Sequence, residues 1–210
     1  MTQYFIIFII LFYSSIASST DKLCPDDMVF TGTSCIDRFE WPNKRGEKPL
    51  LSVSGIKENL TPDINAEELC NSVGKRICVK EEWFEACKGL NNSIYPYGNK
   101  PEETSCNTNK YWKAVDERKV ALRDPKTLIF LDQSEPAGSR EKCVSASGAY
   151  DMVGNAEEWV KCQKGKFGWC LVGGYWASGK AASCKYTITK HAPNWHYNNQ
   201  SFRCCLDIKH

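Results

Sequence analysis

The feature that most constrains the fold of this 210-residue chain is its content of cysteine, which amounts to 12 residues. An even number of cysteines in an exported protein is typical of a disulfide framework, because the reducing cytosol would keep them as thiols. A zinc site would need paired clusters, but no C-x-x-C pair occurs and the three histidines show no ligand spacing. The pattern therefore favours disulfides over zinc. The cysteines concerned are Cys24, Cys35, Cys70, Cys78, Cys87, Cys106, Cys143, Cys162, Cys170, Cys184, Cys204 and Cys205.

The N-terminal segment predicts export. Residues 4–13 (YFIIFIILFY) form an unbroken apolar run, and Ser15 and Ala17 then occupy the −3 and −1 positions of a signal-peptidase site. The run is shorter than the roughly 20 apolar residues that cross a bilayer, although an uncleaved anchor is the alternative. We expect a signal peptide over residues 1–17, a single domain over residues 18–210, a secreted or periplasmic location and no membrane span after signal cleavage.

Composition and local patterns predict an α+β domain. The formal net charge of +2 shows no strong bias, so it indicates neither a nucleic-acid partner nor an anionic membrane. Helices are predicted at residues 65–73, which end at Gly74, and at residues 80–88, which end at Gly89. Short apolar runs between turn residues predict strands. These strands are expected at residues 128–131, 148–152, 171–176 and 201–206.

Several motifs in order give the chain a family resemblance. They are CIDRFE at residues 35–40, GKR leading to EWFEAC at residues 74–87, GAYDMVGNAEEW at residues 148–159, GGYW at residues 173–176 and SFRC at residues 201–204. In order and spacing they resemble the formylglycine-generating enzyme, or sulfatase-modifying factor, superfamily over about residues 24–207. The resemblance implies that family's variant of the C-type-lectin fold, with short helices, an irregular antiparallel sheet and many disulfides.

The resemblance also identifies the positions where oxidase chemistry would lie. The family's oxidase makes formylglycine with copper(I), a soft ion that two free cysteines hold at the sixth and eleventh residues from the first glycine of the G-G-S strand. Here these positions are Ser178 and Ser183, and Cys184 follows one place later. Tyr175 replaces the serine of that strand, and Glu157 replaces the first tryptophan of the G-N-x-W-E-W loop. We therefore expect neither copper binding nor formylglycine generation, and the catalytic residues of any other reaction are unknown.

A second implication of the resemblance is a calcium site. The matching ligands are the carboxylate of Asp151, the carbonyls of Gly154 and Ala156, and the carboxylate of Glu158. Calcium takes six to eight oxygen ligands, so these four atoms with water would form a partial cage. The alternative is that both acids are solvated and the loop only forms a turn.

A further family calcium site would use the side chain of Asn107, the carbonyl of Thr108 and the side chain of Asp132. Three sequons for N-glycosylation also occur in the chain. They begin at Asn59, Asn91 and Asn199.

The disulfide pairing is predicted in three steps. The resemblance implies Cys87–Cys204. Local spacing suggests Cys24–Cys35, Cys70–Cys78 and Cys162–Cys170. Because Cys204 and Cys205 are adjacent in an expected strand, their side chains should point to opposite faces. Cys205 therefore needs a partner on the other side from Cys87. We choose Cys143, which lies just before the calcium-type loop, and this leaves Cys106–Cys184 and no free thiol at Cys184.

Three functions are compatible with these observations. The first is a calcium-stabilised binding module for a peptide or glycan, which the missing copper ligand favours. The second is a divergent metal-dependent oxidoreductase related to formylglycine-generating enzyme. The third is a structural envelope protein with no ligand beyond calcium.

Overall fold

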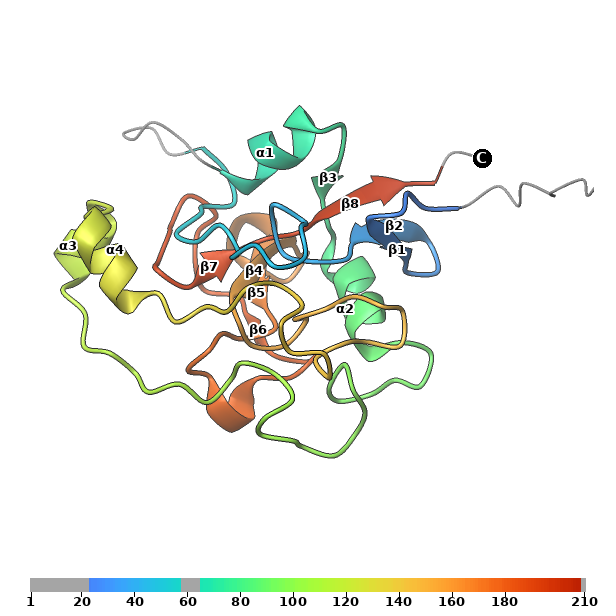
Figure 1. The fold of residues 1–210 in the computed structure, drawn as a ribbon. Coiled ribbons are helices and arrows are strands. Elements are labelled where there is room, and N and C mark those ends of the chain that lie inside the picture. The colour runs from blue at the N-terminus through green and yellow to red at the C-terminus, as the bar shows by residue number, and fades with distance from the viewer. Residues whose placement is uncertain (1–22, 58–64, 209–210) are drawn as a thin grey trace, which may run out of the picture.

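Two small β-sheets organise the protein, for which a computed structural model describes residues 23–57 and 65–208 (Figure 1). The first sheet is antiparallel and has the order β1-β2-β8-β3, with β1 at Met28–Phe30, β2 at Ser34–Asp37, β8 at Cys204–Asp207 and β3 at Arg76–Ile77. The second has the order β6-β5-β4-β7, with β6 at Thr187–Ile188, β5 at Trp169–Val172, β4 at Glu157–Lys161 and β7 at Gln200–Ser201. Its one parallel pair is β4–β7. The signal peptide predicted over residues 1–17 lies outside the described residues.

The two predicted helices are confirmed. α1 spans Ala66–Ser72, and the side chain of its N-cap Asn65 accepts a hydrogen bond from the Glu68 amide at 2.9 Å. α2 spans Lys80–Lys88 and buries Trp83, Ala86 and Cys87 on one face. Both helices follow from local sequence, because each has acids in its first turn and a glycine near its end, and α1 also has the capping residue Asn65.

The predicted strand at residues 128–131 is wrong, because these residues belong to helix α4 (Pro125–Leu131). The Asp124 side chain caps that helix by accepting from the Thr127 amide at 2.8 Å, and Pro125 occupies its first turn. These start signals outweigh a short apolar run, which alone does not distinguish a strand from a helix. α4 packs against α3 (Glu117–Ala121) at the periphery of the molecule (Figure 1).

The other predicted strands need correction as well. Residues 148–152 form no strand beyond a single bridge between Val144 and Tyr150, because Gly148 and Asp151 have φ angles of 91° and 54°. The strand expected at residues 171–176 begins earlier and ends at Val172 as β5, since two glycines with positive φ follow it. The strand expected at residues 201–206 is divided between β7 and β8. The remaining elements are the 3₁₀ turns η1 (Lys166–Gly168) and η2 (Gly179–Ala181).

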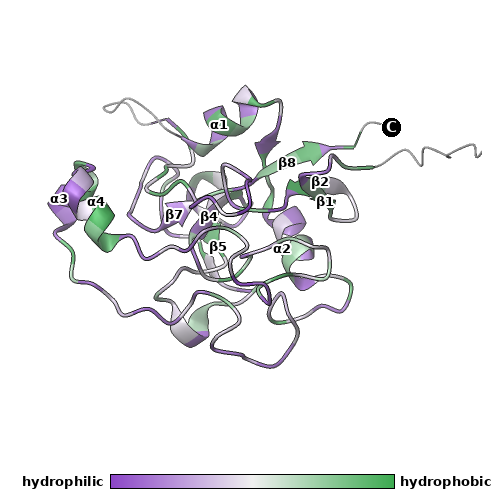
Figure 2. Ribbon diagram, in the orientation of Figure 1, coloured by the Kyte–Doolittle hydropathy of each residue, from purple (hydrophilic) through white to green (hydrophobic). Residues whose placement is uncertain are grey.

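The core lies between these elements and contains large aromatic side chains. Trp83 on α2, Trp159 on β4 and Phe202 between β7 and β8 are fully buried. Figure 2 shows hydrophobic residues on β5 in the middle of the molecule, on β8, and on α4 at the edge. Over the described residues, no helix is both long enough and apolar enough to cross a membrane.

All 12 cysteines form disulfides, as expected, but four of the six predicted pairs are wrong. Cys24–Cys35 and Cys162–Cys170 are present. The predicted pairs Cys70–Cys78, Cys87–Cys204, Cys143–Cys205 and Cys106–Cys184 are replaced by others. The observed pairs are Cys70–Cys204, Cys78–Cys205, Cys87–Cys184 and Cys106–Cys143.

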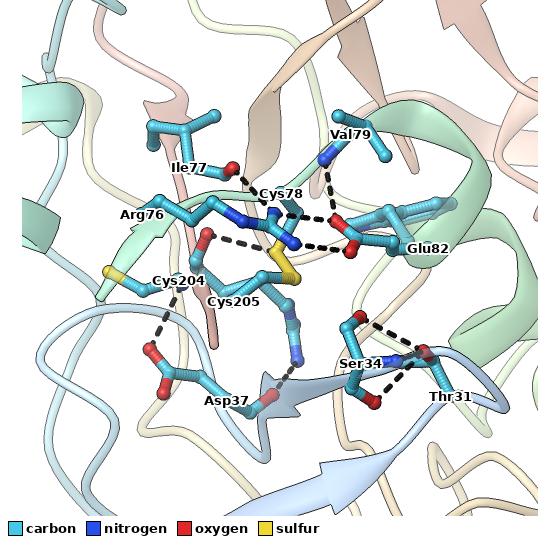
Figure 3. The surroundings of a disulfide bond; sticks show 12 residues. Thr31, Ser34, Asp37, Arg76, Ile77, Cys78, Val79, Glu82, Cys204 and Cys205 are labelled. Atoms are coloured by element: carbon cyan, nitrogen blue, oxygen red, sulfur yellow. Dashed lines mark hydrogen bonds and ion pairs between the residues drawn. A yellow bond between two sulfur atoms is a disulfide. The ribbon is translucent and has the colours of Figure 1, made fainter. Parts of the chain in front are cut away.

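Strand pairing explains why the C-terminal bridges differ from the prediction. β3 pairs with β8, so that Ile77 lies opposite Cys204. This pairing places Cys70 near the end of α1 and Cys78 after β3 next to the two C-terminal cysteines. Cys204 and Cys205 bridge different partners, as the alternation of a strand requires. Figure 3 shows Cys78–Cys205 beside Asp37, which accepts a hydrogen bond from the Cys204 amide at 3.0 Å.

The other two bridges join loops whose proximity only the tertiary structure determines. The Cys184 amide donates to the Ile94 carbonyl at 2.9 Å, which places Cys184 beside the segment that follows α2 and its Cys87. Arg140 donates to the Thr104 carbonyl at 2.8 Å and joins the two loops that carry Cys106 and Cys143.

Candidate functional site

A buried ion pair forms the centre of the predicted calcium loop. Arg203 donates from Nη2 and Nε to the two carboxylate oxygens of Glu158 at 2.6 and 2.7 Å, and both side chains are buried. The indole Nε1 of Trp83 donates to the same carboxylate at 2.7 Å. Bidentate Arg–carboxylate pairs are among the stronger hydrogen-bonded pairs. Because both side chains are buried, the pair is stable only if every polar atom of the two groups has a hydrogen-bond partner.

Main-chain carbonyls satisfy the remaining donors of Arg203. Nη1 donates to the carbonyls of Asp37 at 3.2 Å and Arg38 at 3.3 Å, and Nη2 donates to the carbonyl of Tyr150 at 3.0 Å. The side chain thus joins the segment after β2, the loop before β4 and, through Glu158, helix α2. The SFRC motif therefore supplies a structural arginine at the centre of the fold.

Two further buried acids surround this pair. Asp151 Oδ2 accepts from the Gly138 amide at 2.7 Å, and burial raises the pKa of Asp151 to about 6. Glu40 accepts from the Asn155 side chain at 2.8 Å and from the Ala156 amide at 3.2 Å. Burial, followed by the charges of Asp151 and Glu158, raises the pKa of Glu40 well above its ordinary value. Sequence reasoning missed Glu40, although it closes the CIDRFE motif.

These residues fit a calcium ion by charge. With all three acids ionised, Glu40, Asp151 and Glu158 would carry −3 against the +1 of Arg203, and a divalent cation would offset the remaining −2. The raised pKa of Glu40 means that, without an ion, protonation relieves part of this charge. Glu158 already accepts three hydrogen bonds, whereas a carboxylate has about four acceptor sites. The three carboxylates do not all lie within 4.8 Å of one another. An ion here would therefore also need main-chain carbonyl ligands, and the carbonyls of Gly154 and Ala156 are the ones predicted from the sequence.

The residues of the second expected calcium site are only partly available. Asn107 Nδ2 donates to the Gln133 carbonyl at 3.0 Å, and Asn107 Oδ1 is buried without a hydrogen-bond partner among the described residues. Asp132 pairs with Lys48 at 2.8 Å and accepts from Ser134 at 2.6 Å. The structure thus brings Asn107 next to the residue after Asp132, but the Asp132 carboxylate already has other partners.

The positions of the oxidase copper ligands contain no free sulfur. Cys184 is bonded to Cys87, with 2.04 Å between the sulfur atoms, and is 1% exposed. Ser178 Oγ accepts from the Tyr175 amide at 2.9 Å and closes the turn after β5. Copper(I) prefers thiolate, so a hydroxyl and a disulfide do not fit this ion.

Three of the four positions that depart from the family pattern lie together, namely Glu157, Tyr175 and Ser178, and the fourth is Ser183. Glu157, on the face of β4 opposite Glu158, accepts a hydrogen bond from the Tyr186 hydroxyl at 2.8 Å, and burial raises the pKa of Glu157 to about 7. Burial and the charge of Glu157 raise the pKa of Tyr175, and Ser178 also interacts with the Tyr186 hydroxyl. Oxygen atoms thus line the place where thiolates are expected in the oxidase. No sequence motif pointed to Tyr186.

One group of potential metal ligands in the described part of the chain is Cys78, Glu82 and Cys205 (Figure 3). Its two sulfur atoms form a disulfide, and Arg76 holds the Glu82 carboxylate with bonds of 2.6 and 2.8 Å. A disulfide sulfur is not a thiolate ligand, so this group is structural.

Comparison with known proteins agrees with this architecture. The model of the sulfatase-modifying factor enzyme 1-like domain matches residues 63–208, and the chain therefore belongs to this family. The inactive Cα-formylglycine-generating enzyme 2 of Bos taurus is 29% identical over 157 residues, which cover 68% of this chain and 48% of that protein. The chain thus spans about half the length of this curated relative.

Solved structures support the fold. PvdO from Pseudomonas aeruginosa superposes with a TM-score of 0.54 at 17% identity and covers 83% of this chain and 80% of its own. The I1 variant of the Major Tropism Determinant gives 0.56 at 12% identity, over 88% and 53% of the two chains. Similarity at this level shows the architecture alone.

Proposed function

We propose that this chain is a binding domain of the sulfatase-modifying factor family that does not generate formylglycine. The observation that carries the proposal is the Cys87–Cys184 disulfide together with Ser178 at the first copper position. Without two free thiolates the domain cannot hold copper(I) by the family's mechanism. The similarity to a relative that is named as inactive supports the same conclusion.

The test is turnover of a C-x-P-x-R peptide under air with added copper, followed by mass spectrometry. We expect no mass change at the peptide cysteine. A control enzyme with two copper cysteines should convert the same peptide in parallel. Formation of the aldehyde by this chain would overturn the proposal.

The ligand of such a domain would be a peptide or a glycan, in an exported and calcium-stabilised protein. Six disulfides support an oxidising compartment. The three buried acids around the single charge of Arg203 support calcium, which would lower the raised pKa values of Glu40 and Asp151. Asn107 Oδ1, a buried acceptor without a partner in the described part of the chain, is a candidate ligand for a second ion.

The oxidoreductase alternative has less support. None of the cysteines is a free thiol, so a soft redox metal would lack thiolate ligands in the described residues. Metal analysis of the purified protein separates the two ideas: calcium alone favours the binding domain, and stoichiometric copper or iron would favour the oxidoreductase.

A further inference from the structure

Exposed apolar side chains gather around α3 and α4. Five large ones, here called the α3–α4 surface, occur within 20 residues. They are Tyr111 (91% exposed), Trp112 (57%), Leu122 (81%), Ile129 (77%) and Phe130 (61%). Figure 2 shows hydrophobic residues on α4 at the edge of the molecule, away from the two sheets. Such a concentration on the surface is typical of an interaction site.

Specific contacts hold this surface in place. Val120 and Leu131 are buried and anchor α3 and α4 to the body of the protein. Lys113 donates from Nζ to the Phe130 carbonyl, and the same ammonium lies 4.7 Å above the Phe130 ring. Gln133 donates to the Tyr111 carbonyl at 3.0 Å. The aromatic segment at residues 111–112 therefore lies against α4.

The same part of the chain is basic. Residues 110–131 contain six basic side chains and three acidic ones, a net charge of +3. The whole chain has a net charge of +2, so the rest of the molecule carries −1 and conceals this local excess. The basic residues are Lys110, Lys113, Arg118, Lys119, Arg123 and Lys126, and the acidic ones are Asp116, Glu117 and Asp124. Lys110 pairs with Glu135 at 2.9 Å, so an excess of +2 remains for the surface.

We propose that the α3–α4 surface docks on the surface of an anionic lipid bilayer. Tryptophan and tyrosine prefer the interface between lipid and water, and basic side chains around an apolar face bind acidic headgroups. The position of Lys113 above Phe130 favours lipid over a protein partner, because lysine is depleted from protein interfaces, whereas at a bilayer its stem can follow the apolar surface while its charge reaches the headgroups.

The experiment is co-sedimentation of the full chain with vesicles of phosphatidylcholine, with or without phosphatidylserine. We expect binding to the vesicles that contain phosphatidylserine, weakened by salt, because each basic residue near an anionic surface strengthens binding about fivefold. The double variant I129S/F130S should lose at least about tenfold in partitioning. The matched control is Phe167→Ser, since Phe167 is 70% exposed in η1, also lies beneath a lysine ammonium, and should leave binding unchanged.

A second variant tests charge without removing apolar surface. K119E/K126E should reduce binding to phosphatidylserine vesicles by about tenfold or more, and circular dichroism should confirm that both variants are folded. Equal binding to both kinds of vesicle, or unchanged binding by I129S/F130S, would overturn the proposal. Dimers of the wild-type chain that I129S/F130S dissociates would also overturn it, because the surface would then join two copies.

Discussion

The substitution Arg203→Met should destabilise the protein strongly, because it removes the buried arginine at the centre of the acid cluster. The methionine keeps much of the stem volume but loses the two bonds to Glu158 and the three bonds to main-chain carbonyls. Removal of one partner of a buried pair costs about 3–5 kcal/mol. The free energy of unfolding of a single domain is about 5–15 kcal/mol, so the variant would lose a large part of its stability.

The loss should depend on pH. Burial raises the pKa of Asp151 to about 6 and that of Glu40 well above its usual range, and the charge of Arg203 acts in the opposite direction on both. A raised pKa in the folded state means that stability decreases as pH rises through that value. Without Arg203 both pKa values rise further. The variant should therefore lose more stability at pH 8 than at pH 5.

The assay is urea unfolding at both pH values, with Arg76→Met as the matched control. Arg76 also binds a glutamate through both of its carboxylate oxygens, but its side chain is 35% exposed, whereas that of Arg203 is buried. Glu82 is buried but water reaches the Arg76 side of the pair, so the control should lose clearly less stability than Arg203→Met. Equal effects of the two substitutions, or a loss at Arg203 below about 1 kcal/mol, would refute the reasoning.

Three further predictions concern calcium, Glu157 and glycosylation. If calcium occupies the loop, a chelator should lower the melting temperature, and Asp151→Ala should abolish that difference; an unchanged wild-type melt would exclude the ion. The pKa of Glu157 rises from 4.5 to about 7 on burial, so stability is lost as pH rises through about 7. Glu157→Gln should therefore stabilise the protein by up to about 3 kcal/mol at pH 9 and have little effect at pH 4, which urea unfolding would measure. In a glycosylating secretory host, exposed Asn91 should accept a glycan and buried Asn199 should not, and digestion by a glycosidase with mass spectrometry would detect either.

The sequence was informative where local signals or a run of motifs determine structure. The Asn65 cap and Gly74 define α1, first-turn acids and Gly89 define α2, and the order of the motifs predicted the fold. The short spacing of Cys24 to Cys35 and of Cys162 to Cys170 predicted two bridges. The strand prediction failed at residues 128–131, because a four-residue apolar run is compatible with a strand or a helix. The cap at Asp124 makes this segment a helix.

The long-range bridges and part of the site could not be predicted in this way. Cys87 and Cys184 are 97 residues apart, and only the contact of Cys184 with the loop after α2 brings them together. Motif matching placed Asp151 and Glu158 in one loop. It gave no indication that Glu40 approaches that loop, because this contact joins residues 115 positions apart in the sequence.

The partner of Cys184 decides most directly whether the oxidase chemistry is absent. Peptide mapping without reduction, after the unfolded protein has been treated with an alkylating reagent, should recover a Cys87–Cys184 linked peptide and no alkylated Cys184. Recovery of alkylated Cys184 from the unfolded, unreduced protein would contradict the account, since a free thiol would then be available for the family's copper chemistry.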